Sequence, residues 1–130
     1  MNQLEKLTKI YTAYAEKNTF TQSPKGLYEP INYILNIGGK RLRPLMLLMS
    51  CGLYTDDLTK ALAPAYAIEI FHNFTLLHDD IMDDAPLRRG KTTVHHKWNT
   101  NTGILSGDVM LVYAYEYLRE VDAVILPEVL

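Results

Sequence analysis

The segment that decides the fold runs from Leu58 to Asp84 and reads LTKALAPAYAIEIFHNFTLLHDDIMDD. A long apolar run between polar flanks, with no strand alternation in it, predicts an α-helix. Asp56 or Asp57 stands before the run as a candidate N-cap, and Pro64 marks either a kink or a later start of the helix. The segment therefore predicts one long apolar helix that ends in a cluster of aspartates.

The sequence on both sides of this helix also carries helical patterns. Pro30 is expected near the start of a second helix that Gly38 and Gly39 end, and Pro44 suits the first turn of a third. The predicted helices span residues 4–14, 28–37, 44–53, 58–82 and 103–118, with a loop at 19–26 and a long polar connection at 84–100. Because neither strand alternation nor an internal repeat occurs, the predicted fold class is all-α.

Composition limits the kind of protein. The 130 residues are 48% hydrophobic and 22% charged, which is typical of one globular domain with a real core. A net charge of −2 gives no electrostatic case for binding nucleic acid. The single cysteine, Cys51, excludes an internal disulfide and fits a reducing compartment. No signal peptide opens the chain and no apolar run could span a bilayer, so we expect a cytoplasmic protein.

The end of the sequence lacks a stop signal. Pro127 interrupts the last segment, and the chain stops at Leu130 in an apolar, helix-compatible run. We therefore expect the domain to continue beyond residue 130.

The aspartates at the end of the long helix predict a metal site. Asp79 and Asp83 lie one turn apart on one helix face, and Asp80 is offset by ~100°. These carboxylates repel one another at the negative end of the helix dipole, and a cation is the simplest compensation. Oxygen ligands with open coordination positions suit Mg²⁺. The alternative is a solvated acidic helix end; a calcium loop of the EF-hand type is excluded by the spacing.

Two basic groups flank the long helix in the sequence. Gly38 to Pro44 reads GGKRLRP, which places cations beside a glycine turn and a helix N-terminus that favours anions. Lys40 and Arg43 can converge on one diphosphate, and a second pair, Arg88 and Arg89, closely follows the aspartates. Each group alone could be a solvated surface feature. Beside the aspartates, the basic groups predict a site that handles both a metal and the phosphates it carries.

His72 lies seven residues, nearly two turns, before Asp79 and so shares its helix face. Its placement makes it a candidate for the same site. The alternative is a hydrogen-bonded histidine in the core.

Taken in order, these motifs resemble the trans-prenyl diphosphate synthase family, also called polyprenyl synthetases. The resemblance rests on four stretches, which are residues 38–44, 72–83, 87–91 and 101–108, and covers roughly residues 28 to 120. Class I terpene cyclases share an aspartate-rich helix, but they lack the GGKRLRP segment and the paired arginines in this arrangement. Each motif is weak alone, whereas the ordered set is specific.

The resemblance implies an isoprenoid-synthase helical bundle around a deep cavity. Residues 1–130 would form the N-terminal part of a single polyprenyl synthetase domain that continues beyond the chain end. Full-length members carry a second aspartate-rich motif and a downstream lysine, which this sequence lacks, so the chain alone is expected to be inactive. Family members are commonly homodimers, and we expect one here for the full-length protein.

The resemblance also implies the activity and the roles of the site residues. The activity is the Mg²⁺-dependent condensation of an allylic prenyl diphosphate with isopentenyl diphosphate; the alternative is a non-catalytic regulatory subunit. The implied Mg²⁺ ligands are Asp79 and Asp83, with Asp80 in support. Arg88 would hold the allylic diphosphate. The implied isopentenyl diphosphate residues are Gly39, Lys40, Arg43, His72 and Arg89.

Two positions on the long helix bear on product length. Phe74 and Thr75 lie five and four residues before Asp79, hence ~6–8 Å along the helix from it at 1.5 Å per residue. In the resembled family, bulk at these positions sets the floor of the cavity. One aromatic of the two implies a farnesyl or geranylgeranyl product. The alternative is that Phe74 packs against a neighbouring helix.

Overall fold

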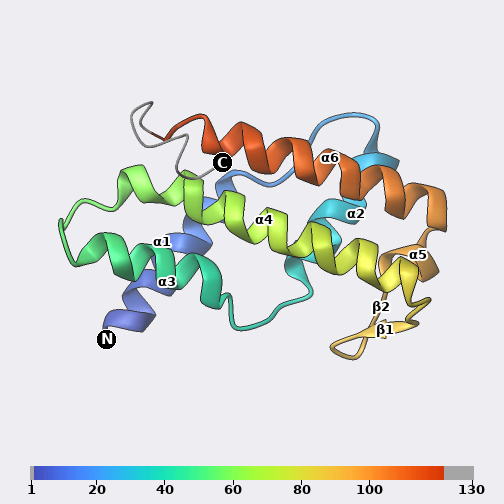
Figure 1. Ribbon diagram of the computed structural model, residues 1–130, viewed down its shortest axis with the longest axis horizontal. Helices are drawn as coiled ribbons and strands as arrows, with labels where there is room; N and C mark the ends of the chain where they lie inside the picture. Colours follow the sequence, from blue (N-terminus) through green and yellow to red (C-terminus); the bar gives the residue numbers. More distant parts are fainter. Residues whose placement is uncertain (1, 122–130) are drawn as a thin grey trace. The chain divides into compact units, whose positions relative to one another are not determined.

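The structure is a computed structural model that describes residues 2–121. These residues form helices and one short hairpin, which confirms the all-α prediction (Figure 1). The helices are α1 Gln3–Lys17, α2 Lys25–Asn36, α3 Leu42–Gly52, α4 Thr59–Met82, α5 Val94–Lys97 and α6 Thr100–Leu118, and β1 Leu87–Arg88 pairs antiparallel with β2 Lys91–Thr92. Pro127 and the last predicted segment lie outside the described residues. Between residues 2 and 121, no helix combines the length and apolarity needed to cross a membrane.

The chain divides into two compact units. Among the described residues, the first unit comprises residues 2–18, 41–69 and 113–121, and the second comprises residues 19–40 and 70–112. Because α4 and α6 are long, each contributes one part to each unit. Every residue predicted to bind metal or substrate belongs to the second unit, except Arg43.

A cluster of tyrosines forms part of the core of the first unit. The ring of Tyr66 on α4 meets those of Tyr11, Tyr14 and Tyr117 edge-on, with centroids 6.4, 5.8 and 5.0 Å away. The hydroxyl of Tyr66 donates to the backbone carbonyl of Asn18 at 3.0 Å. Burial raises the pKa of Tyr66 and of Tyr11 well above the usual value. These hydroxyls therefore resist ionisation in alkaline solution more than an exposed tyrosine does.

The start of α4 confirms one of the two predicted caps. Asp57 Oδ1 accepts hydrogen bonds from the backbone N–H of Thr59 at 3.1 Å and from its hydroxyl at 2.7 Å. Pro64 lies inside α4, which continues through it, so Pro64 is not the helix start. The expectation that Pro30 stands near the start of its helix is wrong, because α2 begins five residues earlier, after the N-cap Pro24.

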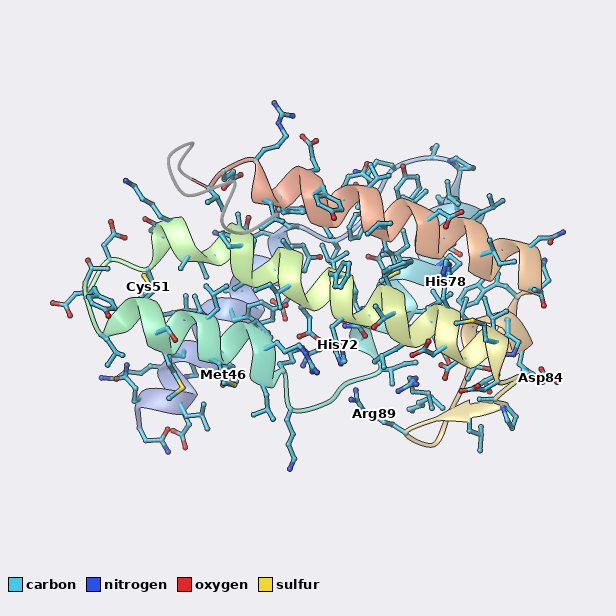
Figure 2. All side chains as sticks on the ribbon, viewed as in Figure 1. Met46, Cys51, His72, His78, Asp84 and Arg89 are labelled. Atoms are coloured by element: carbon cyan, nitrogen blue, oxygen red, sulfur yellow. The ribbon has the colours of Figure 1, made fainter. Side chains whose placement is uncertain are left out.

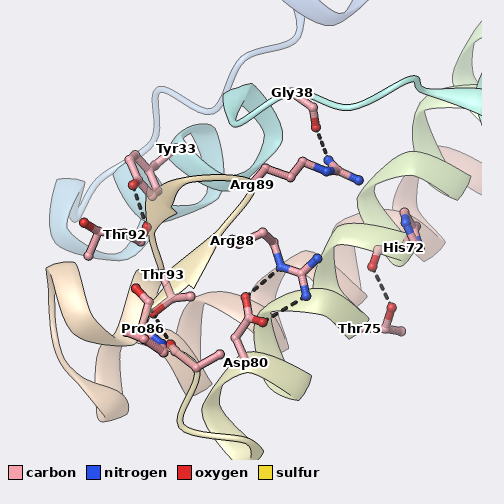
Figure 3. A network of polar contacts seen from close by, with 11 residues as sticks. Tyr33, Gly38, His72, Thr75, Asp80, Pro86, Arg88, Arg89, Thr92 and Thr93 are labelled. Carbon is pink, nitrogen blue, oxygen red and sulfur yellow. Dashed lines mark hydrogen bonds and ion pairs between the residues drawn. The ribbon is translucent and has the colours of Figure 1, made fainter.

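The connection between α4 and α6 holds more structure than the sequence predicted. Arg89 and Gly90 form a two-residue turn with φ of +50° and +79°, the conformation that suits a tight hairpin. We call residues 87–92 the arginine hairpin. Strands of two residues are too short to show alternation, which is why the sequence did not predict them. The hydroxyl of Tyr33 on α2 donates to the carbonyl of Thr92 at 2.6 Å and holds the hairpin to that helix (Figure 3).

Candidate functional site

A bidentate ion pair attaches the arginine hairpin to the end of α4. Arg88 Nε and Nη2 donate to the two carboxylate oxygens of Asp80, at 2.8 and 2.9 Å (Figure 3). The Asp80 side chain is 9% exposed and that of Arg88 is 23% exposed. The hydrogen bond to Asp80 raises the pKa of the Arg88 guanidinium above its usual value, against the opposing effect of partial burial. The negative charge of the Asp80 carboxylate is therefore already balanced by Arg88, and a metal ion bound by Asp80 would share the carboxylate with this arginine.

Asp79 and Asp83 differ from Asp80 because both are exposed. The N–H of Asp83 donates to the carbonyl of Asp79 at 2.9 Å, so helical geometry continues for one residue past α4 and keeps the two one turn apart. Within residues 2–121 the three aspartates do not gather their oxygens into a tight ligand set. Two exposed carboxylates fit Mg²⁺, which takes few protein ligands and completes its coordination with water and substrate phosphates.

The glycine turn and the second arginine of the hairpin lie together, although they are 51 positions apart in the sequence. Arg89 Nη1 donates to the carbonyl of Gly38 (Figure 3). Gly39 has φ of +127°, and a Cβ at this position would overlap the Arg89 guanidinium. Glycine is therefore required here both for the backbone conformation and for the space. Lys40, which follows directly, is exposed.

Four further candidates, His72, Phe74, Thr75 and Arg43, lie on α4 or α3. His72 is half-buried, and its backbone carbonyl accepts a hydrogen bond from the hydroxyl of Thr75 at 2.6 Å (Figure 3). The ring of Phe74, also half-buried, lies 4.8 Å from that of His78 and 5.7 Å from that of Phe71. Arg43 is part of the first unit, where it is exposed in the first turn of α3. Its role in the site stays a prediction made from the sequence.

Sequence reasoning gave no role to one polar cluster. Asp84, His95 and His96 bring three potential metal-ligand atoms within 4.8 Å of one another. The sequence offered two hints of this cluster: Asp84 lies just outside the DDxxD motif, and a pair of histidines begins eleven residues after it. Nothing in the sequence showed that the connection folds back to bring them together.

Comparison with known proteins identifies the family. The family model described as polyprenyl synthetase matches residues 24–130. Geranylgeranyl pyrophosphate synthase of Geoglobus acetivorans is 48% identical over 102 residues, which are 78% of this chain and 32% of that protein. Geranylgeranyl diphosphate synthase of Saccharolobus solfataricus is 48% identical over 104 residues, 80% of this chain and 31% of that protein.

Comparison of the fold with solved structures indicates the same family. A crystal structure of a geranylgeranyl pyrophosphate synthase superposes with a TM-score of 0.92 at 50% sequence identity, covering 98% of this chain and 39% of the other. The chain belongs to the polyprenyl synthetase family. It spans about a third of the length of the curated relatives it matches.

Proposed function

We propose that this chain carries the first half of the active site of a Mg²⁺-dependent prenyltransferase, which condenses an allylic prenyl diphosphate with isopentenyl diphosphate. The ion pair between Asp80 and Arg88 carries the proposal, because it draws the arginine hairpin onto the aspartate end of α4. Carboxylates that suit a metal and cations that suit phosphate thereby occupy one place. The contact between Arg89 and Gly38 joins the glycine turn to the same hairpin, which supports including Lys40, two residues after Gly38, in the proposed site.

The residues present fit a reaction in which a diphosphate leaves an allylic carbon. Asp79 and Asp83 would hold Mg²⁺, which would supply positive charge to stabilise the departing diphosphate. Arg88 uses two N–H donors on Asp80 and retains three others for phosphate oxygens. Interactions that strengthen as charge develops on the leaving group lower the barrier of this step. The departing diphosphate is a suitable proton acceptor, so the proposal requires no side-chain base.

The rest of the proposal concerns the protein around this site. Because the matched residues make up only about a third of each relative, we propose that these residues form the N-terminal part of one catalytic domain. The second aspartate-rich motif and the downstream lysine would come from further sequence. A cytoplasmic location and a homodimer remain part of the proposal, on the basis of the single cysteine and of the family resemblance.

The test is a condensation assay on the full-length protein. Radiolabelled isopentenyl diphosphate and an allylic diphosphate should give extractable product with Mg²⁺ and none with excess chelator. A folded, dimeric full-length protein without turnover would contradict the proposal and favour a non-catalytic regulatory subunit.

We predict that Lys40→Ala raises the KM for isopentenyl diphosphate, by about tenfold, with a smaller effect on the allylic substrate. Loss of one charged hydrogen bond to a phosphate is worth about 1.5 kcal/mol or more, which is roughly tenfold. Arg43→Ala should act in the same direction. Steady-state kinetics with each substrate varied in turn measures both effects.

The matched control for Lys40 is Lys60→Ala, since Lys60 is also exposed but lies at the start of α4 in the first unit. Lys60→Ala should leave both KM values unchanged. Equal increases in both KM values for Lys40→Ala would contradict the assignment of Lys40 to isopentenyl diphosphate.

We predict that Phe74→Ala lengthens the product beyond the farnesyl or geranylgeranyl product proposed for the unmodified protein. The physical reason is that removing a half-buried ring from α4 lets a growing chain extend further along the helix. Chromatography of the dephosphorylated products measures the shift. Phe71→Ala is the control, because Phe71 is an aromatic neighbour on the same helix that is 46% exposed. An unchanged product distribution in Phe74→Ala would remove Phe74 from the floor of the cavity.

A further inference from the structure

Asp84, His95 and His96 are here called the Asp-His-His cluster. Asp84 lies just past the end of α4 (Figure 2), and the two histidines lie on α5, which follows the arginine hairpin. Asp84 Oδ1 is 3.3 Å from His95 Nε2 and 3.1 Å from His96 Nε2. Two imidazoles thus converge on a single carboxylate oxygen. The Asp-His-His cluster differs in chemistry from the proposed Mg²⁺ ligands, Asp79 and Asp83, because two of its three ligand atoms are nitrogens.

The backbone builds the cluster from both ends of the connection. Asp84 adopts a left-handed conformation with φ of +48° directly after α4, which aspartate tolerates better than most residues. The two histidines lie on α5, whose N-cap is Thr93. The Thr93 hydroxyl donates to the carbonyl of Ala85 at 2.7 Å, and its N–H donates to the carbonyl of Pro86 at 3.1 Å. The two ends of the connection are therefore held together independently of the cluster.

Two of the three ligand separations in the cluster suit a tetrahedral transition metal; the three atoms together lie within 4.8 Å, so binding would bring the two imidazoles closer to each other. Zn²⁺ binds imidazole nitrogen and carboxylate oxygen at about 2.0–2.2 Å, which places neighbouring ligand atoms roughly 3.3–3.5 Å apart. The two oxygen–nitrogen separations are already close to that value. Imidazole ligands favour Zn²⁺ and its neighbours over Mg²⁺, which prefers oxygen.

We propose that the Asp-His-His cluster is a binding site for a divalent transition metal ion of the Zn²⁺ type. The ion is held by Asp84 Oδ1 and the Nε2 atoms of both histidines. Asp84 and His96 are exposed, with side-chain exposures of 84% and 41%, so the ion can enter and a water can fill the fourth position. The proposal does not depend on the prenyltransferase activity.

The surroundings of His95 limit the affinity of this site for the metal ion. Its side chain is 5% exposed, and its Nδ1 is buried without a hydrogen-bond partner. A histidine that binds metal through one nitrogen usually donates the other N–H to an acceptor, and loss of that acceptor weakens affinity about 10–100-fold. We therefore expect moderate affinity, which makes binding reversible. Metal binding at Nε2 would leave the ring proton on Nδ1, where it meets no acceptor, so this buried N–H is a cost that limits the affinity.

Metal binding would clamp the arginine hairpin. The ion joins Asp84, two residues past α4, to the helix that follows β2, and the segment between them carries Arg88 and Arg89. Local opening of this segment would then require release of the metal as well as rupture of the Thr93 hydrogen bonds. The expected consequence is a metal-dependent increase in the stability of the segment.

The experiment titrates the full-length protein with Co²⁺, a coloured substitute for the spectroscopically silent Zn²⁺, in excess Mg²⁺ to occupy the oxygen-rich site. We expect a visible absorption band from nitrogen-ligated Co²⁺ at one equivalent, lost on addition of Zn²⁺. His96→Ala and Asp84→Asn should each weaken Co²⁺ binding about tenfold or more. Hydrogen exchange of residues 85–94 should slow with Zn²⁺ in the unmodified protein and not in these variants.

Two controls separate this site from others. Asp108→Asn alters another exposed carboxylate that faces an imidazole, His78 at 3.9 Å, and should bind Co²⁺ like the unmodified protein. Asp79→Ala should also retain the absorption band, because it removes only a ligand of the proposed Mg²⁺ site. Unchanged affinity in both His96→Ala and Asp84→Asn, or absence of the band in the unmodified protein, would overturn the proposal.

Discussion

Replacement of Asp79 or Asp83 by alanine is expected to lower the turnover of the full-length protein by at least about a thousandfold, with little change in stability. Each substitution removes a carboxylate proposed to hold Mg²⁺, and loss of one electrostatic contact to a developing charge already costs about a hundredfold to a thousandfold in rate. Both side chains are exposed, so neither substitution opens a cavity in the core. Steady-state turnover and a thermal melt of each variant measure the two effects separately.

Asp56→Ala serves as the control, because Asp56 is an exposed aspartate in the loop before α4 and has no proposed role in binding metal or substrate. It should retain full turnover. Near-normal Mg²⁺-dependent condensation by either Asp79→Ala or Asp83→Ala would contradict the assignment of these residues as metal ligands.

Arg88→Ala is expected to impair both stability and activity. The substitution leaves the carboxylate of Asp80, 9% exposed, without the two hydrogen bonds that neutralise it. Removing one partner of a fully buried pair costs about 3–5 kcal/mol, and partial exposure of Arg88 reduces the expected loss to about 2 kcal/mol. Turnover should fall further than stability alone explains, because the donors proposed to hold the allylic diphosphate are also lost. Denaturant unfolding and kinetics with the allylic substrate varied measure the two losses.

A double-mutant cycle tests whether Asp80 and Arg88 act as a pair. Asp80→Ala combined with Arg88→Ala should lose less stability than the sum of the single losses, since no buried charge is left unpaired. Turnover should not recover in the double variant. Arg119→Ala is the matched control, because Arg119 forms an exposed pair with Glu116 and should contribute little. Additive losses at positions 80 and 88 would show that the two side chains are not energetically coupled.

Local patterns were sufficient to predict every long helix of the described residues, but not the short helix α5, which lies in the predicted connection. The apolar run that becomes α4, the Asp57 cap and the glycines after α2 each act over a few residues, so they can be read directly from the sequence. The spacing of Asp79 and Asp83 is a property of any helix and was predictable for the same reason. The motif order then indicated the family, which the comparisons confirmed.

Contacts between distant residues were decided only by the tertiary structure. The sequence treated Asp80 as one of three metal ligands and Arg88 as a ligand of substrate, whereas the structure pairs them. The sequence did not predict the hairpin that carries Arg88. It also did not predict that Asp84 lies beside His95 and His96. Such contacts depend on the path of the connection after α4. That path is set by the left-handed conformation of Asp84, the two-residue turn and the Thr93 hydrogen bonds acting together, and no periodic pattern in the sequence encodes that combination.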